Sequence, residues 1–99
     1  MESPYASGNW VVTPGCEKKF VERWTDFLEW TRSSFAELRS AQLIQDAEDP
    51  RHFVSFASWN NADAMQIWRA RPEFAEKLDA CRALCEDFRG ASYTLAAMV

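Results

Sequence analysis

The sequence predicts an α+β sandwich, in which helices pack on one face of a four-stranded sheet. Apolar residues recur at helical spacing in two long segments, and four other segments between turn signals are interpreted as strands. These segments follow one another in the order strand, helix, strand, strand, helix, strand. No linker, repeat or low-complexity segment divides the 99 residues, so we expect a single domain over residues 1–99.

The first strand and the first helix are predicted over residues 5–12 and 16–33. Thr13-Pro14-Gly15 ends the strand, and we expect it to start the helix, with Thr13 as N-cap and Pro14 at the first helical position. The helix presents one apolar face, and charged residues occupy the opposite face. That apolar face is formed by Phe20, Val21, Trp24, Phe27, Leu28 and Thr31.

Two further strands are predicted over residues 35–45 and 52–59, joined by a polar turn. Ser33-Ser34 breaks the preceding helix, and Pro50 prevents the second strand from continuing through the turn. Residues 52–59 carry large apolar side chains on both alternating faces. This pattern is typical of a central strand.

The second half is predicted to hold an interrupted helix and a last strand. Asn60-Asn61 supplies an N-cap, and Pro72 interrupts the helix and opens its second part, which Gly90 ends. That second part carries a stripe at steps of four, three, four and three: Phe74, Leu78, Cys81, Cys85 and Phe88. Residues 92–98 form the last strand.

The resulting β-α-β-β-α-β order is that of the ferredoxin-like α+β sandwich. Such a sheet has one face without helices, and several large apolar residues must fall on it. An apolar face of this size normally needs a partner. We therefore expect a homodimer joined through the open sheet faces, with the C-terminal strand over residues 92–98 reaching the partner.

Composition argues against several classes of protein. The net charge of −4 disfavours a nucleic-acid partner. No apolar run is long enough to span a membrane, and the N-terminus lacks the pattern of a secretory signal, so we expect a cytoplasmic protein. Three cysteines and one histidine form no pattern typical of a metal site or a disulfide framework. We expect no metal, flavin or other cofactor.

Several polar residues have an ordinary structural interpretation. Cys81 and Cys85 lie on the apolar stripe and are expected in the core. His52 begins a strand beside a turn, which favours a surface or structural role over that of a base. Arg69 and Arg71, beside the Pro72 break, either guide an acidic substrate or are exposed charges at a helix end, and we favour the latter.

Several residues between about Asn9 and Met98 follow one another in a characteristic order. They are Val11-Val12-Thr13-Pro14-Gly15, Phe35, Asp49-Pro50-Arg51-His52-Phe53, Ser58-Trp59-Asn60-Asn61-Ala62-Asp63-Ala64, Trp68 and Pro72-Glu73-Phe74. In this order and spacing the chain resembles the antibiotic biosynthesis monooxygenase domain family, which forms dimeric α+β barrels.

The resemblance implies that Trp68 lies in a substrate cavity. Some cofactor-independent monooxygenases of the family add an Asn one helical turn earlier and a Tyr six residues later, where this chain has Ala64 and Phe74. The haem-degrading branch adds a His ten residues after the Trp and an Asn on the first strand. Leu78 and Gly8 occupy those positions here, which argues against haem degradation.

The leading hypothesis is a cofactor-independent monooxygenase acting on a phenol- or quinol-type aromatic small molecule. Trp68 is the candidate catalytic residue, and Asn9 and Asn60 are the candidate polar groups. The expected cavity walls are Trp24, Phe27, Phe56 and Phe74. The alternative is a non-catalytic dimeric module that binds an apolar small molecule or packs these aromatics as core. We expect Trp68 to matter more for ligand binding than for stability.

Overall fold

A computed structural model describes residues 3–99, which form four strands and three helices. In chain order these are β1 (Pro4–Val12), α1 (Glu17–Ser34), β2 (Leu38–Gln45), β3 (His52–Trp59), α2 (Ala62–Ala70), α3 (Pro72–Arg82) and β4 (Cys85–Thr94). The strands form one sheet in the order β2-β3-β1-β4, in which all neighbours are antiparallel. The predicted ferredoxin-like class is therefore confirmed.

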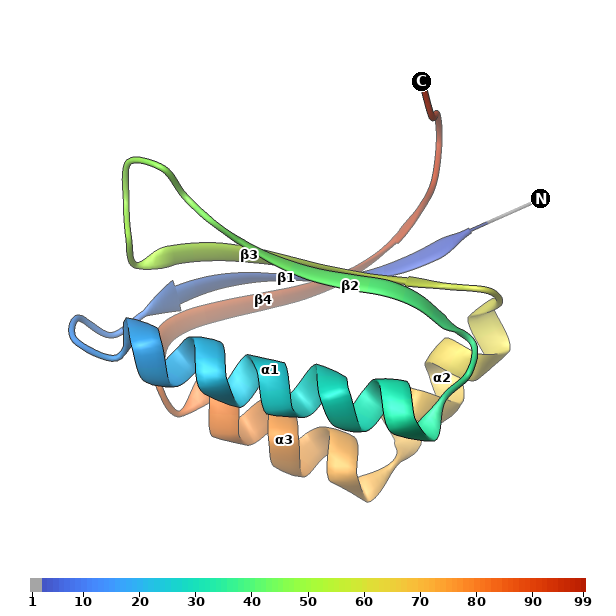
Figure 1. The fold of residues 1–99 in the computed structure, drawn as a ribbon, viewed down its shortest axis with the longest axis horizontal. Coiled ribbons are helices and arrows are strands. Elements are labelled where there is room, and N and C mark those ends of the chain that lie inside the picture. Colours follow the sequence, from blue (N-terminus) through green and yellow to red (C-terminus); the bar gives the residue numbers. More distant parts are fainter. Residues whose placement is uncertain (1–2) are drawn as a thin grey trace.

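All three helices cover the same face of the sheet, and the opposite face is open (Figure 1). The strand burial follows this arrangement, because side chains alternate between the two faces. On β1, residues at even positions such as Ala6 and Trp10 are buried toward the helices, while Asn9 is exposed on the open face. β3 occupies the predicted central place, between β2 and β1.

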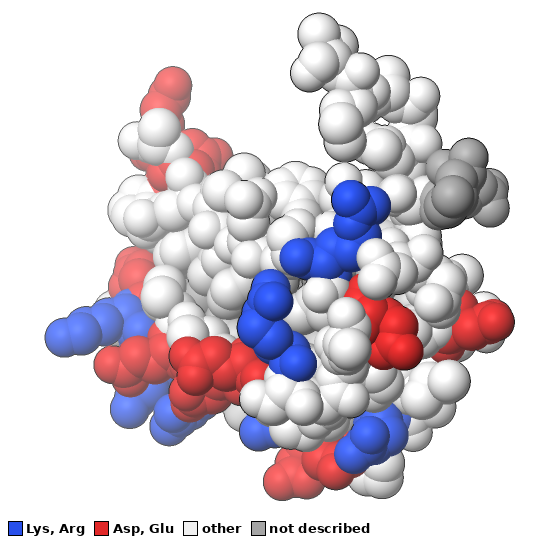
Figure 2. Space-filling view, turned by 45° about the vertical axis from the view of Figure 1, so that its right-hand side comes forward, with Lys and Arg blue, Asp and Glu red and all other residues white. Residues whose placement is uncertain are grey.

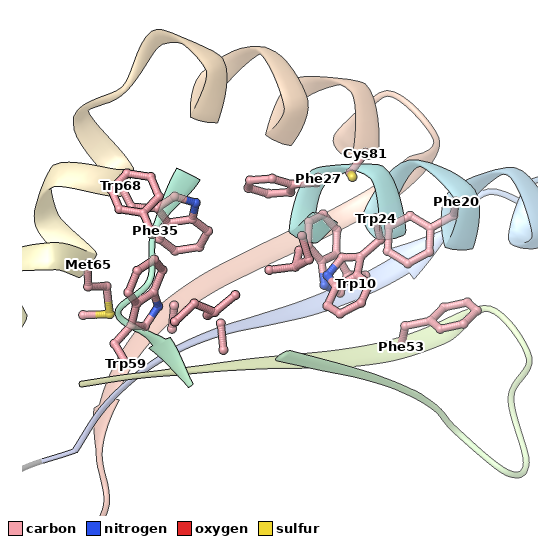
Figure 3. Packing of buried hydrophobic residues seen from close by; sticks show 14 of the residues in the cluster. Trp10, Phe20, Trp24, Phe27, Phe35, Phe53, Trp59, Met65, Trp68 and Cys81 are labelled. Atoms are coloured by element: carbon pink, nitrogen blue, oxygen red, sulfur yellow. The ribbon is translucent and has the colours of Figure 1, made fainter. Parts of the chain in front are cut away.

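The core between the two layers is unusually aromatic. The predicted face of α1 is buried, apart from Val21, which is 40% exposed. Side chains from every element except β4 join the buried cluster (Figure 3). The largest fully buried side chains are Trp59, Phe20, Val12, Thr31 and Cys81.

The start of α1 differs from the prediction. Thr13 and Pro14 lie outside the helix, which begins at Glu17 and receives no side-chain cap. The Thr13 carbonyl instead accepts a hydrogen bond from the amide of Cys16 at 3.0 Å, and Gly15 has a φ of 90°. Proline followed by a residue with positive φ is the pattern of a type II turn, so this segment is a turn and not the first helical turn.

The boundary between α3 and β4 also differs from the prediction. The helix ends at Arg82, and Cys85 and Phe88 lie on the last strand. Gly90 is part of that strand and pairs with Gly8, so it does not end a helix. The predicted strand over residues 92–98 therefore begins seven positions too late, and residues 95–99 lie outside the sheet.

The remaining helix boundaries agree with the sequence. Asn61 is the N-cap of α2, and its Oδ1 accepts a hydrogen bond from the amide of Ala64 at 2.8 Å. The chain becomes extended at Arg71, and Pro72 opens α3, as predicted. No helix within residues 3–99 is long and apolar enough to cross a membrane.

Candidate functional site: an aromatic cavity between helices and sheet

A cavity of about 280 Å³ lies between the helical layer and the sheet. Its floor is made by small residues that neighbour one another across three strands. In the strand register, Gly8 of β1 pairs with Ser55 of β3 on one side and with Gly90 of β4 on the other. Two residues earlier on β1, Ala6 pairs with Ala57 of β3 and with Ser92 of β4. Small side chains at these alternate positions leave space that the helices do not fill.

The roof of the cavity is aromatic and comes from all three helices. α1 contributes Trp24 and Phe27, α2 contributes Trp68, and α3 contributes Phe74. The rings of Trp24, Phe27 and Trp68 lie between the helices and the sheet (Figure 3). Trp68 is the residue that was expected in the cavity as catalytic candidate, and the other three were expected as walls. Phe56, the fourth expected wall residue, also borders the cavity, although strand alternation assigns its side chain to the open face.

Trp68 is both a cavity residue and a core residue. Its indole is 4% exposed and packs against Phe27, Trp59 and Phe74, with ring centroids 4.7–5.7 Å apart. The indole N–H donates to Thr31 Oγ1 at 2.9 Å, and the Thr31 hydroxyl donates to the carbonyl of Phe27. Trp68 therefore lines the cavity and belongs to the core at the same time, so the two roles that were alternatives in the sequence coincide.

Trp10 and Ser55 form a polar contact at the cavity wall. The Trp10 indole N–H donates to Ser55 Oγ at 3.0 Å, and both side chains are buried. Ser55 accepts in this bond, and nothing else among residues 3–99 takes its hydroxyl proton. Its O–H is thus available to a ligand oxygen.

Arg69 and Ser92 lie where the cavity reaches the surface. Gly90, Ala91 and Ser92 of β4 line the cavity and are exposed, so the cavity opens along this edge. Arg69 Nη1 donates to Ser92 Oγ at 2.7 Å. Desolvation by burial lowers the pKa of the Arg69 guanidinium below its usual value.

The two predicted polar candidates lie elsewhere. Asn60 is exposed in the bend before α2 and does not line the cavity. Asn9 is exposed on the open face of the sheet, where its Oδ1 lies 2.9 Å from His52 Nε2. His52 Nδ1 lies 3.0 Å from Asp46 Oδ2, and this hydrogen bond lowers the pKa of Asp46. The three side chains fasten the β2–β3 hairpin to β1, which is a structural role for His52.

Of the three free cysteines, Cys81 is buried and Cys16 and Cys85 are half-buried. Burial raises the pKa of Cys81 to about 12 and that of Cys85 to about 11. Cys81 lies in the core as predicted, whereas Cys85 packs against the core from β4. Within residues 3–99, no group of three or more His, Cys, Asp or Glu side chains is placed to hold a metal ion.

The floor of the cavity was not predicted from the sequence, and of its mouth only Arg69 was considered, as one of two alternatives. The signal for the floor was present: Ala6 and Gly8 alternate with larger residues on β1, and Ser55 and Ala57 do the same on β3. The mouth had no such signal, because Arg69 and Ser92 come from elements whose pairing only the fold reveals.

The fold and the cavity together define an α+β sandwich with an aromatic cavity between its two layers. The family of antibiotic biosynthesis monooxygenases matches residues 6–84, and the chain belongs to this family. No curated protein sequence matches it.

Solved structures share the same fold over nearly the whole chain. A mutant of SnoaB, a cofactor-independent oxygenase from Streptomyces nogalater, has 18% identity and a TM-score of 0.89, covering 98% of this chain and 96% of that one. A conserved protein from Methanosarcina mazei Go1 has 14% identity and a TM-score of 0.83, covering 94% and 92%. At such identities the likeness shows the fold alone.

Proposed function

We propose that the protein is a cytoplasmic, cofactor-independent monooxygenase acting on a phenol- or quinol-type aromatic small molecule in the cavity. The observation that carries the proposal is the cavity itself, roofed by Trp24, Phe27, Trp68 and Phe74 and floored by small residues. Planar aromatic ligands stack favourably against such rings. Membership of the monooxygenase family supports the choice of reaction.

The proposed reaction uses the substrate as its own reductant. An activated CH₂ group next to the aromatic ring loses a proton, and the resulting carbanion transfers electrons to O₂. Carbon and oxygen combine to a peroxide, which loses water and leaves a carbonyl, so CH₂ and O₂ become C=O and H₂O. Ser55 would donate a hydrogen bond to the oxygen on which negative charge develops.

The cavity offers no ordinary base for the first step. Among the described residues that line it, Arg69 is the one titratable side chain. The proton therefore passes to solvent at the mouth, and turnover should follow the ionisation of the substrate. The haem-degrading reaction is not proposed, because Leu78 and Gly8 stand where that branch has His and Asn.

Oxygen consumption with an anthrone as test substrate checks this proposal. We expect turnover under ¹⁸O₂ to place one labelled oxygen in the ketone and the other in water. Ala57→Leu, which fills the cavity floor, should lower turnover, and Ala62→Leu at an exposed site on α2 should not. Ligand binding without turnover would instead support a non-catalytic binding module, which the lack of a base in the cavity also favours.

We further propose that the protein is a homodimer joined through the open sheet faces. Val54, Phe56 and Tyr93 lie on this face with Ile44, and Figure 2 shows few charged side chains between the β2–β3 hairpin and the C-terminal segment. An apolar face of this kind is stabilised by burial against a second copy. The apolar residues that follow β4 lead away from the helices (Figure 1), on the side where a partner would lie.

Sedimentation equilibrium tests the dimer with two matched isoleucines. Ile44 on the open face and Ile67 on α2 are 52% and 57% exposed. We expect the wild type to sediment at twice the chain mass of 11.4 kDa. Ile44→Asp should shift it toward the monomer, because a buried unpaired charge is costly, whereas Ile67→Asp should not. A monomeric wild type at micromolar concentration would rule out the dimer.

A further inference from the structure

Arg69 is the one charged residue among the described residues that line the cavity. It belongs to α2 directly after Trp68, so the guanidinium and the indole come from neighbouring positions on one helix. Ser92 fixes its direction through the hydrogen bond from Arg69 Nη1 at 2.7 Å. The positive charge is therefore held at the place where a ligand would enter.

No carboxylate neutralises this charge. Within residues 3–99, none of the ion pairs involves Arg69, and desolvation is the one influence that shifts the pKa of its guanidinium. The residue as a whole is exposed, so its charge stays accessible at the mouth of the cavity. An anionic ligand there would pair with it without displacing a carboxylate of the protein.

Arg71 shows the contrast, two positions further along. Its guanidinium makes two hydrogen bonds to the carboxylate of Glu73, at 3.0 and 3.3 Å, and lies over the rings of Trp30 and Phe35. Arg71 does not line the cavity. The two arginines looked equivalent in the sequence, where exposed helix-end charges were favoured over guides for an acidic substrate. Arg69 is exposed, as that interpretation expects, but it also lines the cavity. Arg71 is half-buried and paired with Glu73.

We propose that Arg69 and Ser92 bind a carboxylate of the substrate, so that the proposed monooxygenase acts on an aromatic acid. A guanidinium presents parallel N–H donors that match the two oxygens of a carboxylate. The Ser92 hydroxyl accepts from Arg69, which leaves its own proton to donate to the same anion. A carboxylate is ionised at neutral pH, whereas a simple phenol is not.

This arrangement fixes the orientation of the substrate. The aromatic part would enter below Trp24, Phe27 and Trp68, and the carboxylate would remain at the exposed edge beside β4. A charged group at that edge keeps part of its hydration, so its binding costs little desolvation. Ser92 thus binds the carboxylate itself and also fixes the direction of Arg69.

Calorimetric titration with 2-naphthoate and its neutral analogue 2-naphthamide tests the inference, which rests on the proposed function. Both probes carry the same ring system, so the ratio of their Kd values reports the anion alone. We expect wild type to prefer naphthoate about tenfold, the factor that one charge-assisted hydrogen bond provides. Arg69→Gln should abolish the preference, and Arg69→Lys should keep part of it. The preference should also shrink in high salt.

Arg32→Gln is the matched control, since Arg32 is an exposed helical arginine remote from the cavity lining. It should leave the preference unchanged. Equal affinity of wild type for both probes, or a preference that survives Arg69→Gln, overturns the assignment of Arg69 but leaves the aromatic cavity in place. Failure of wild type to bind either probe overturns the proposed aromatic site, and the inference falls with it.

Discussion

Replacing Trp68 by alanine is expected to destabilise the protein by about 3–5 kcal/mol, the usual cost of removing a buried Trp or Phe side chain. The indole is 4% exposed and packs against Phe27, Trp59 and Phe74. Its loss also leaves the hydroxyl of Thr31 without its donor. This expectation replaces the one from sequence, which gave Trp68 a small role in stability because it considered the cavity without the packing around it.

Denaturant unfolding of two further variants separates the contribution of the aromatic ring to stability from that of its hydrogen bond. Trp68→Phe keeps an aromatic ring and loses the hydrogen bond to Thr31, so we expect a smaller loss, about 1–2 kcal/mol. Ile67→Ala on the exposed side of the same helix should change stability by less than about 0.5 kcal/mol. Trp68→Ala with wild-type stability would show that the ring packs loosely and that the described contacts carry little energy.

Ligand binding should fall in the same Trp68 variants. Titration with 2-naphthamide below the unfolding range measures this without the charge of Arg69, because the probe is neutral. The proposed stacking predicts weaker binding in Trp68→Ala than in Trp68→Phe. Unchanged binding in both would restrict Trp68 to the core and leave the roof to Trp24, Phe27 and Phe74.

Periodicity predicted most of the fold because most elements are bounded by strong local signals. α1 has a continuous apolar face, and α2 has Asn61 at its start and Pro72 just after its end. The α3–β4 boundary failed because Cys81, Cys85 and Phe88 continue a helical spacing, and no Gly or Pro marks the turn at residues 83–84. Gly90 was predicted to end the helix because glycine is common there. It lies instead in β4, where it pairs with Gly8.

The aromatic roof of the candidate site was predicted from the sequence, whereas its polar groups were not. Large aromatic residues at helical spacing, such as Trp24 and Phe27, can be recognised directly in a sequence. The parity of a strand decides which face a polar residue occupies, and Asn9 falls on the open face while its neighbour Gly8 faces the cavity. Long-range pairs such as that of Arg69 with Ser92 depend on how strands and helices assemble.

Gly8→Ala is expected to destabilise the protein by about 1–3 kcal/mol, because it overpacks a buried site. A Cβ at position 8 would lie 2.7 Å from Trp10 Nε1 and 2.8 Å from Ser55 Oγ. These two atoms are joined by a hydrogen bond and belong to buried side chains, so neither can move without breaking the contact. The overlap outweighs the roughly 0.5–1 kcal/mol that alanine normally gains over glycine in a strand.

Gly90→Ala is the matched control, since Gly90 pairs directly with Gly8 across β1 and β4 and also lines the cavity. Its Cβ would lie 3.2 Å from Phe88 Cζ, and Phe88 is a half-buried ring on the edge strand that can shift slightly. We expect a change in the free energy of unfolding below about 0.5 kcal/mol.

Unfolding midpoints measure the effects of both substitutions, and the indole N–H resonance of Trp10 reports the hydrogen bond to Ser55. That resonance should move in Gly8→Ala and stay in place in Gly90→Ala. Equal stability of the two variants, with Trp10 unperturbed in both, would mean that the wall of the cavity yields easily. The hydroxyl of Ser55 would then lack the fixed position that its proposed role requires.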